Sequence, residues 1–194
     1  SYRSWAGPIA AAMAKGKASR APRVWLMTDP RIDAVLLASA RALPFGSAII
    51  LRHYDLPQSE RRALFARLRR IARQRGHSLF LAGDERIARR WGADGFHGRT
   101  TGRTNLRHST AVHDRRELAL AHRLGADTVL ISPVHRTASH PAARPLGPMA
   151  FRDLAMLATH GADVVALGGM NRARFQMMRI PVMGWAAIGA LAKS

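Results

Sequence analysis

Short apolar runs alternate with longer amphipathic runs along the chain from Arg23 onward. Each short run suits a buried strand, and each longer run carries apolar residues at helical spacing. The predicted strands are Val24–Met27, Ala48–Leu51, Ser78–Ala82, Gly95–His97, Ser109–Val112, a sixth beginning at Thr128, Val164–Leu167 and an eighth beginning within residues 181–185. The predicted helices are Ile32–Leu43, a long one capped by Ser59, Glu85–Trp91, Arg115–Leu124, Met149–Thr159 and Ala173–Met178.

Eight strands separated by helices predict an α/β fold, namely a (β/α)8 TIM barrel of parallel strands in a single domain. A doubly wound open sheet is the alternative. We prefer the barrel because eight strands can be counted and no glycine-rich dinucleotide fingerprint follows the first of them. The predicted barrel occupies residues 23–194, after a basic arm or helix formed by residues 1–22.

The chain is strongly basic, with a formal net charge of +19 over 194 residues. This charge fits nucleic acid, an acidic membrane surface or an anionic substrate, and does not choose among them. No apolar run approaches the roughly 20 residues that a membrane helix needs, so we expect no membrane span. We expect a cytoplasmic protein. The absence of cysteine excludes disulfides, thiolate metal sites and a cysteine nucleophile.

Arginines crowd the long helix that follows Ser59. The apolar stripe of this helix consists of Leu64, Phe65, Leu68, Ile71 and Ala72. Its arginines fall largely off that stripe, at positions 61, 62, 67, 69, 70 and 73. They form either a solvated face or a patch for RNA, and the N-terminal arm has the same alternatives of contact with lipid or RNA.

The stretch from Thr128 to Pro148 combines an apolar strand with a loop of hydrogen-bond donors. The donors of the loop are His135, Arg136, Thr137, Ser139, His140 and Arg144, and no carboxylate accompanies them. This composition favours an anion, although a plain solvated crossover loop has similar residues.

The polar residues that follow the other strands belong to the same predicted site, because the active sites of such barrels lie at the carboxyl ends of the strands. These residues include Arg52, Tyr54, Asp84, His97 and His113, and the late strands add Gly168-Gly169 and the backbone of Ala186 and Ala187. We expect Tyr54, His97 and His113 to form the pocket wall. A zinc site is an alternative for the histidines, but no HxH or HxxxH pair supports it.

In their order along the chain, these residues resemble thiamine phosphate synthase and its tautomerase relatives of the TenI type, over roughly Val24 to Leu191. The resemblance rests on Thr28-Asp29, Arg52, Asp84, the segment Gly92–His97, His113 followed by Glu117, Gly125-Ala126-Asp127, Ser132-Pro133-Val134, Thr137-x-Ser139 and the segment Ala166–Asn171.

The resemblance implies a barrel that joins an aminopyrimidine pyrophosphate to a thiazole phosphate, with release of pyrophosphate and with Mg²⁺ as cofactor. In that scheme Arg52 and the Mg²⁺ ligand Asp84 hold the pyrophosphate, and Thr137 and Ser139 bind phosphate oxygens. The thiazole phosphate lies on Gly168-Gly169 and on the backbone at Ala186 and Ala187. His135 or His140 is a candidate for proton transfer, since an imidazole titrates near neutral pH.

The chain departs from the family pattern at several positions. Tyr54 and His140 replace lysines, Gly83 replaces an asparagine, and Ala111 replaces a serine. The second acidic metal ligand is missing from Arg99–Gly102, and Pro133 stands where the tautomerases have their histidine. These departures leave open the alternative that the chain is a catalytically degraded family member, which acts as a ligand sensor or as a basic RNA- or protein-binding barrel. The oligomeric state also stays open, a homodimer included.

Overall fold

The computed structural model describes residues 22–137, 144–180 and 182–191. Its strands are β1 (Val24–Met27), β2 (Ala48–Leu51), β3 (Ser78–Ala82), β4 (Gly95–His97), β5 (Arg107–Val112), β6 (Thr128–Ile131), β7 (Asp163–Leu167) and β8 (Gly184–Ala187). Its α-helices are α1 (Leu36–Ala42), α2 (Gln58–Arg75), α3 (Glu85–Trp91), α4 (Arg115–Arg123), α5 (Gly147–Ala158) and α6 (Arg172–Met177). Two 3₁₀ helices are η2 (Pro30–Ile32) and η3 (Gly189–Leu191).

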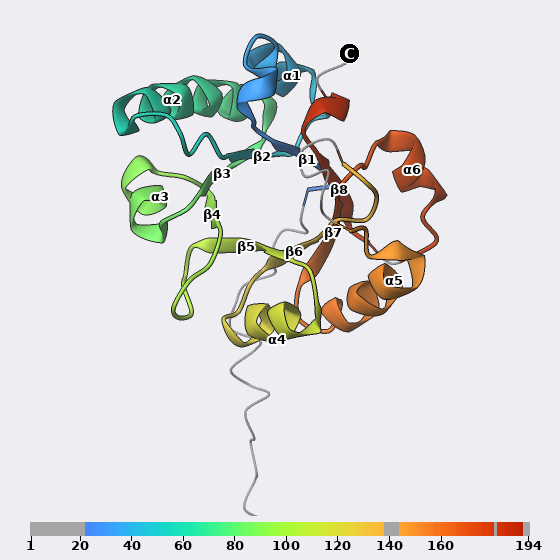
Figure 1. Cartoon of the computed structure of the whole chain (residues 1–194). Coiled ribbons are helices and arrows are strands. Elements are labelled where there is room, and N and C mark those ends of the chain that lie inside the picture. Colours follow the sequence, from blue (N-terminus) through green and yellow to red (C-terminus); the bar gives the residue numbers. More distant parts are fainter. Residues whose placement is uncertain (1–21, 138–143, 181, 192–194) are drawn as a thin grey trace, which may run out of the picture.

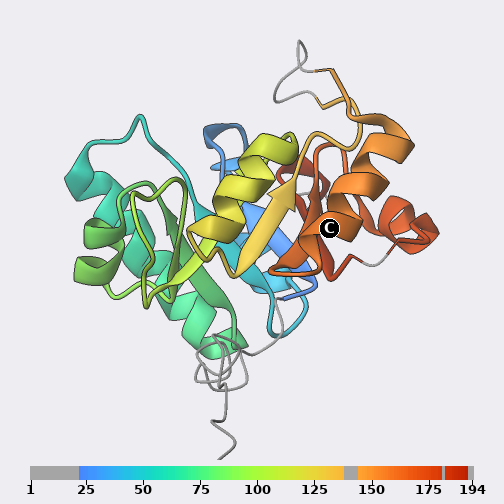
Figure 2. The same cartoon turned by 90° about the horizontal axis from the view of Figure 1, so that it is seen from below.

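The eight strands form a closed barrel in which each strand pairs in parallel with the next, and β8 pairs with β1. This confirms the predicted (β/α)8 barrel and rules out the open sheet. Figure 1 looks into the barrel and shows the surrounding helices, with an interruption beside β4 and β5. There residues 98–106 connect the two strands without a helix. Figure 2 shows the barrel from the side, with β6 between α4 and α5.

Large side chains fill the inside of the barrel. The interior cluster consists of Trp25, Met27, Ala48, Ile50, Phe80, Ala82, Leu130, Val165 and Ala186. The rings of Trp25 and Phe80 are 5.0 Å apart, and the guanidinium of Arg107 lies 5.2 Å from the Phe80 ring at the amino-terminal end of the strands. A Cβ at Gly95 would lie 2.3 Å from the Phe80 ring, so β4 passes this ring only as glycine. Because these side chains fill the interior, a ligand of the barrel itself binds at the ends of the strands and not inside it.

Two boundaries differ from the prediction in an informative way. Pro57, not Ser59, is the N-cap of α2, and no side chain caps this helix. The prediction for Ser59 was therefore wrong; the proline sets the entry of the chain with φ −50° and ψ 146°. The helix predicted at Ile32–Leu43 is split, because Asp29 caps η2 and α1 begins at Leu36.

In the part of the chain that the structure describes, no helix has the length and apolar character needed to cross a membrane. The prediction for residues 1–22 falls almost entirely outside the described residues.

Candidate functional site

Two adjoining hollows lie at the carboxyl ends of the strands. The larger one, here called the central hollow, has a volume of about 600 Å³. Its polar lining consists of Arg52, Tyr54, His97, His113, Ser132, Thr137 and Arg144. The smaller one, here called the glycine hollow, has a volume of about 380 Å³ and is lined by residues 167–171 and 186–189. Thr137 and Gly168 line both, so the two hollows share a wall.

A still larger hollow, of about 980 Å³, lies on the outside of the barrel between α1 and α6. It is lined by the start of β1 at Arg23 and Val24, away from the carboxyl ends of the strands. The volume of a hollow therefore does not locate the site. The polar residues at the carboxyl ends of the strands locate it.

The alternation of side chains along each strand explains which residues reach the central hollow. Ala48 and Ile50 of β2 point into the barrel, so the next residue of the same parity, Arg52, also points inward, at the mouth. Phe96 packs in the outer layer beneath the helices, and its neighbour His97 therefore faces inward. The barrel pattern thus delivers a guanidinium and an imidazole to one hollow.

His97 is held as a neutral hydrogen-bond acceptor. Its Nδ1 lies 3.1 Å from Ser109 Oγ, and that hydroxyl donates to the Phe96 carbonyl at 3.3 Å. Because the hydroxyl has a single proton, Nδ1 of His97 is the donor to Ser109, and Nε2 keeps its lone pair. Burial is the main cause that lowers the pKa of His97 to about 4, and the charges of Arg52 and His108 contribute to this lowering. At neutral pH His97 therefore offers an acceptor, not a positive charge.

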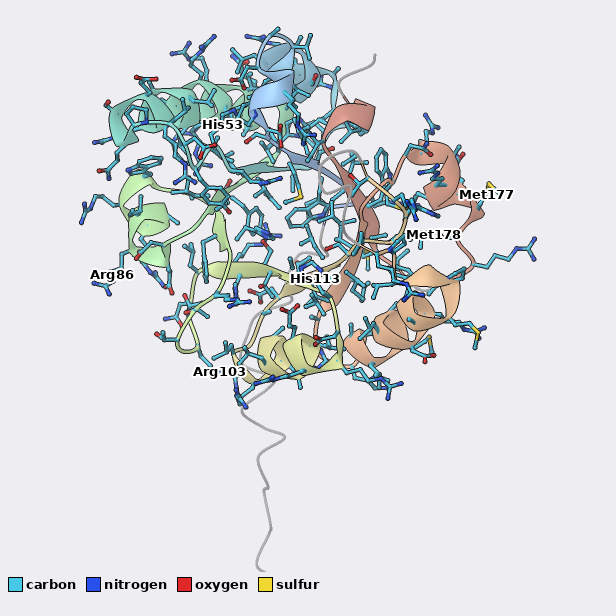
Figure 3. The ribbon with its side chains drawn as sticks, in the orientation of Figure 1. His53, Arg86, Arg103, His113, Met177 and Met178 are labelled. Carbon is cyan, nitrogen blue, oxygen red and sulfur yellow. The ribbon has the colours of Figure 1, made fainter. Side chains whose placement is uncertain are left out.

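His113 is exposed at the mouth of the barrel, where Figure 3 labels it. Its Nδ1 donates to the Ser132 carbonyl at 2.7 Å, which leaves Nε2 for a ligand. Its backbone N–H donates to Glu117 at 2.9 Å, so α4 fixes its position. With Tyr54 and His97, it lines the central hollow.

Arg52 provides positive charge from the end of β2. Its backbone N–H donates to Thr28 Oγ1 at 2.9 Å, and its guanidinium lies 3.9 Å from Asp29. Asp29 is more closely paired with Arg31, at 2.6 and 2.9 Å, and this hydrogen bonding is the main cause that lowers the pKa of Asp29 to about 2. Since Arg31 already compensates Asp29, the charge of Arg52 remains effective for a ligand.

The glycine hollow depends on two glycines with positive φ, Gly168 at 97° and Gly169 at 60°. The loop after β6 lies directly against them, with the Val134 N–H donating to the Leu167 carbonyl at 2.9 Å and the His135 N–H donating to the Gly168 carbonyl at 3.1 Å. A Cβ at Gly168 would lie 2.7 Å from Pro133, and one at Gly169 would lie 2.6 Å from the Arg136 carbonyl. The glycines thus admit the loop that brings Thr137 to the wall of the hollow.

Arginines surround the glycine hollow. Arg31, Arg136 and Arg174 line it, and Arg174 also donates to the Gly169 carbonyl. Among the described residues that line the two hollows there is no carboxylate. Ala186 and Ala187 line the glycine hollow, and their contact with a phosphate stays a prediction. Both hollows therefore favour an anion.

Other predicted site residues lie elsewhere. Asp84 caps α3, where its Oδ1 accepts from the N–H groups of Arg86 at 2.6 Å and Ile87 at 3.3 Å, and it lines neither hollow. His135 also lines neither; burial lowers its pKa, and Arg174 lowers it further. Ser139 and His140 lie outside the described residues.

The described residues do not provide a ready Mg²⁺ site. No cluster of three or more His, Cys, Asp or Glu within them could hold a metal ion. One oxygen of the Asp84 carboxylate is occupied by backbone donors, and the next carboxylate along the chain, Glu85, is bonded to Arg89 and Thr104. Mg²⁺ commonly uses one or two carboxylates together with substrate phosphates, so the predicted ligand would depend on the substrate for the rest of its shell.

Arg61 supports the strand ends beside the central hollow, and its prediction as part of a solvated face or an RNA patch was wrong. Its guanidinium donates to the carbonyls of Leu51 at 3.3 Å and Ala82 at 2.6 Å, and it lies 5.4 Å from the Tyr54 ring. It therefore ties together the carboxyl ends of β2 and β3. Its position four residues before Phe65, on the buried stripe of α2, is the signal that could have revealed it.

Comparisons with known proteins identify the family of the chain. Residues 24–191 match the family model described as Thiamine monophosphate synthase. The chain is 37% identical over 153 residues to the thiamine-phosphate synthase of Chromobacterium violaceum, which covers 71% of this chain and 72% of that protein.

Solved structures agree on the fold. The thiamine phosphate pyrophosphorylase of Pyrococcus furiosus has a TM-score of 0.74 at 23% identity and covers 89% of this chain and 88% of its own. An HpcH/HpaI aldolase from Desulfitobacterium hafniense has a TM-score of 0.52 at 12% identity, with 86% and 85% covered. The family match spans nearly all of the described barrel, and the chain belongs to the thiamine monophosphate synthase family.

Proposed function

We propose that the chain binds a thiazole phosphate in the glycine hollow and an aminopyrimidine pyrophosphate in the central hollow, and joins them into thiamine phosphate. The observation that carries this proposal is the pair of adjoining hollows, which share Thr137 and Gly168 and have arginines but no carboxylate in their described lining. The shared wall would bring the two ligands next to each other.

In the proposed reaction, the bond between the pyrimidine methylene carbon and the pyrophosphate oxygen breaks, and the electron pair leaves with pyrophosphate. A bond forms between the same carbon and the thiazole nitrogen. The role of the protein is to stabilise the charge that develops on the leaving group and to hold the nitrogen close to the carbon. Arg52 and Arg144, which line the central hollow, are suited to the first task.

Binding of the thiazole phosphate would rely on backbone N–H groups and guanidinium groups. Gly168 and Gly169 let an anion approach the main chain, and Arg136 and Arg174 supply charge beside it. We derive no step through Mg²⁺, because the described residues do not form a site for it. Asp84 remains a prediction as its ligand.

Isothermal titration with thiazole phosphate, inorganic pyrophosphate and thiamine phosphate tests the binding. We expect Arg52→Met to weaken pyrophosphate binding selectively, whereas Arg62→Met, an exposed arginine on α2, leaves all three affinities unchanged. A wild-type chain that binds none of the three would overturn the proposal. An assay of thiamine phosphate formation, with both substrates and added Mg²⁺, then tests the joining step and separates an enzyme from a ligand sensor.

The alternative of a basic RNA-binding barrel receives less support from α2. Arg61 and Arg75 donate to backbone carbonyls, and Arg69 is paired with Asp94 at 2.7 Å. These three guanidinium groups serve the fold itself. A steep salt dependence of RNA binding, abolished by charge reversal at the exposed positions of α2, would favour the alternative.

A further inference from the structure

A chain of hydrogen bonds connects the surface near α1 to the backbone of Arg52. His53 Nε2 lies 2.7 Å from Asp33 Oδ1, and His53 Nδ1 lies 2.7 Å from Thr28 Oγ1. The same hydroxyl oxygen accepts the backbone N–H of Arg52 at 2.9 Å. The side chain of His53 is 0% exposed, whereas that of Asp33 is 54% exposed. Figure 3 shows His53 on the side of the barrel that α1 and α2 cover.

The direction of each bond follows from the proton inventory. A carboxylate only accepts, so the proton on the His53–Asp33 bond belongs to Nε2. In the neutral imidazole Nδ1 is then an acceptor, and it takes the hydroxyl proton of Thr28. The oxygen of Thr28 keeps a lone pair for the Arg52 N–H. Donors and acceptors therefore match along the whole chain, and each group fixes the orientation of the next.

The backbone at His53 gives this arrangement a second consequence. Among the described residues, His53 is the one non-glycine residue with a positive φ, at 35°. Such a conformation costs an L-residue about 1–2 kcal/mol and persists when surrounding contacts over-determine it. Here the imidazole is anchored to β1 through Thr28 and to the C-cap of η2 through Asp33. These anchors set the direction in which the chain leaves β2, and hence the placement of Arg52 and Tyr54 on either side.

Thr28 and His53 cannot contact a ligand themselves. Both are buried, and neither lines the central hollow or the glycine hollow. Their neighbours Arg52 and Tyr54 do line the central hollow. An effect of this pair on binding must therefore pass through those neighbours.

We propose that His53, held between Asp33 and Thr28, is a positioning residue that fixes Arg52 in the central hollow for a pyrophosphate group. The choice of pyrophosphate as the ligand rests on the proposed function. The positioning of Arg52 by His53 and Thr28 rests on the hydrogen bonds alone. Two buried side chains that touch no substrate, Thr28 and His53, thereby affect the binding of pyrophosphate through Arg52. We also expect a smaller effect on the glycine hollow, because none of the residues in this chain of bonds lines that hollow.

The test compares Thr28→Val, which keeps the shape and loses the hydroxyl, with Thr28→Ser, which keeps the hydroxyl. Thr28→Val loses the hydrogen bonds of the hydroxyl to His53 and to the Arg52 N–H, so we expect it to weaken the binding of inorganic pyrophosphate about tenfold and Thr28→Ser to restore it. Thiazole phosphate binding should change less than about twofold in both. His53→Gly, which relieves the φ but removes the imidazole, should behave like Thr28→Val. Thr159→Val, an exposed threonine on the far end of α5, is the control for the substitution itself.

Hydrogen exchange of the Arg52 amide gives a readout that needs no ligand. Its exchange should be about tenfold faster in Thr28→Val and His53→Gly than in the wild type, but not in Thr28→Ser. Unchanged protection of this amide, or an equal loss of both ligands in Thr28→Val, would refute the positioning role. If the wild type binds no pyrophosphate, the proposed function fails, and the exchange rates still decide whether Thr28 and His53 fix Arg52.

Discussion

Replacing Gly168 with alanine tests the glycine hollow most directly. The residue has φ 97°, and an added Cβ would lie 2.7 Å from Pro133 Cα, 2.8 Å from Pro133 Cβ and 3.1 Å from the Val134 nitrogen. The backbone conformation costs about 1–2 kcal/mol for a non-glycine residue. The overlap must push the loop after β6 away, which weakens the hydrogen bonds of Val134 to Leu167 and of His135 to Gly168, worth about 1 kcal/mol each. We therefore expect Gly168→Ala to lower the free energy of unfolding by roughly 3–4 kcal/mol.

Two other glycines separate the contributions. Gly46 has φ 75° but open space around its Cβ position, so Gly46→Ala measures the conformational cost alone, about 1–2 kcal/mol. Gly189 lines the glycine hollow with neither a positive φ nor a neighbour within 4 Å, so Gly189→Ala should change stability by less than about 0.5 kcal/mol. Urea unfolding measures all three, and titration with thiazole phosphate shows whether the hollow survives. A Gly168→Ala chain no less stable than Gly46→Ala would refute the packing of the loop on the glycines.

Two further predictions concern stability. The folded-state pKa of His97, about 4, lies below its ordinary value of 6.5, so the unfolded chain binds more protons between these pH values. The stability that His97 contributes is thus lost as the pH falls from 6.5 towards 4; His97→Gln should flatten this slope in urea unfolding at several pH values, and the exposed His160→Gln should not. Arg61→Leu leaves the carbonyls of Leu51 and Ala82 without their donor and should cost about 2 kcal/mol in the same assay. Arg62→Leu, on the exposed face of α2, should cost under about 0.5 kcal/mol, and equal losses for the two arginines would contradict the role of Arg61.

The strands could be predicted closely where apolar runs end at glycine, proline or charged residues. The bounds of β1 to β4 agree with the prediction. β5 begins at Arg107, two residues earlier than predicted. The prediction missed these two residues because their side chains are polar. Arg107 closes the bottom of the barrel over Phe80, and His108 stacks on Phe96 with ring centroids 4.5 Å apart. Partners that lie far away in the sequence make these polar residues suitable for a strand, and hydropathy does not reveal such partners.

The candidate site divides in the same way. Arg52, His97, His113 and Gly168 could be predicted because the carboxyl ends of parallel strands must meet at one end of a barrel. Arg61 and Arg174 come from helices, and Arg31 comes from η2. Whether a helical arginine turns towards a strand end or towards solvent depends on how the helix packs. The topology of the barrel alone fixes where the side chains at the strand ends lie, so these side chains can be predicted from the sequence.

Binding and turnover make different demands on the two hollows. Binding of a phosphate needs donors that are in place before the reaction, and we propose that the arginines and the glycine backbone of the glycine hollow supply them. Turnover needs charge compensation that grows as pyrophosphate departs. In the central hollow the cations at described positions are Arg52 and Arg144, because Tyr54 stands where the family has a lysine and Asp84 is engaged at the start of α3. Substitutions at Thr28 or Arg52 should therefore act on pyrophosphate and turnover while leaving thiazole phosphate bound, whereas Gly168→Ala should act on both hollows through the wall they share.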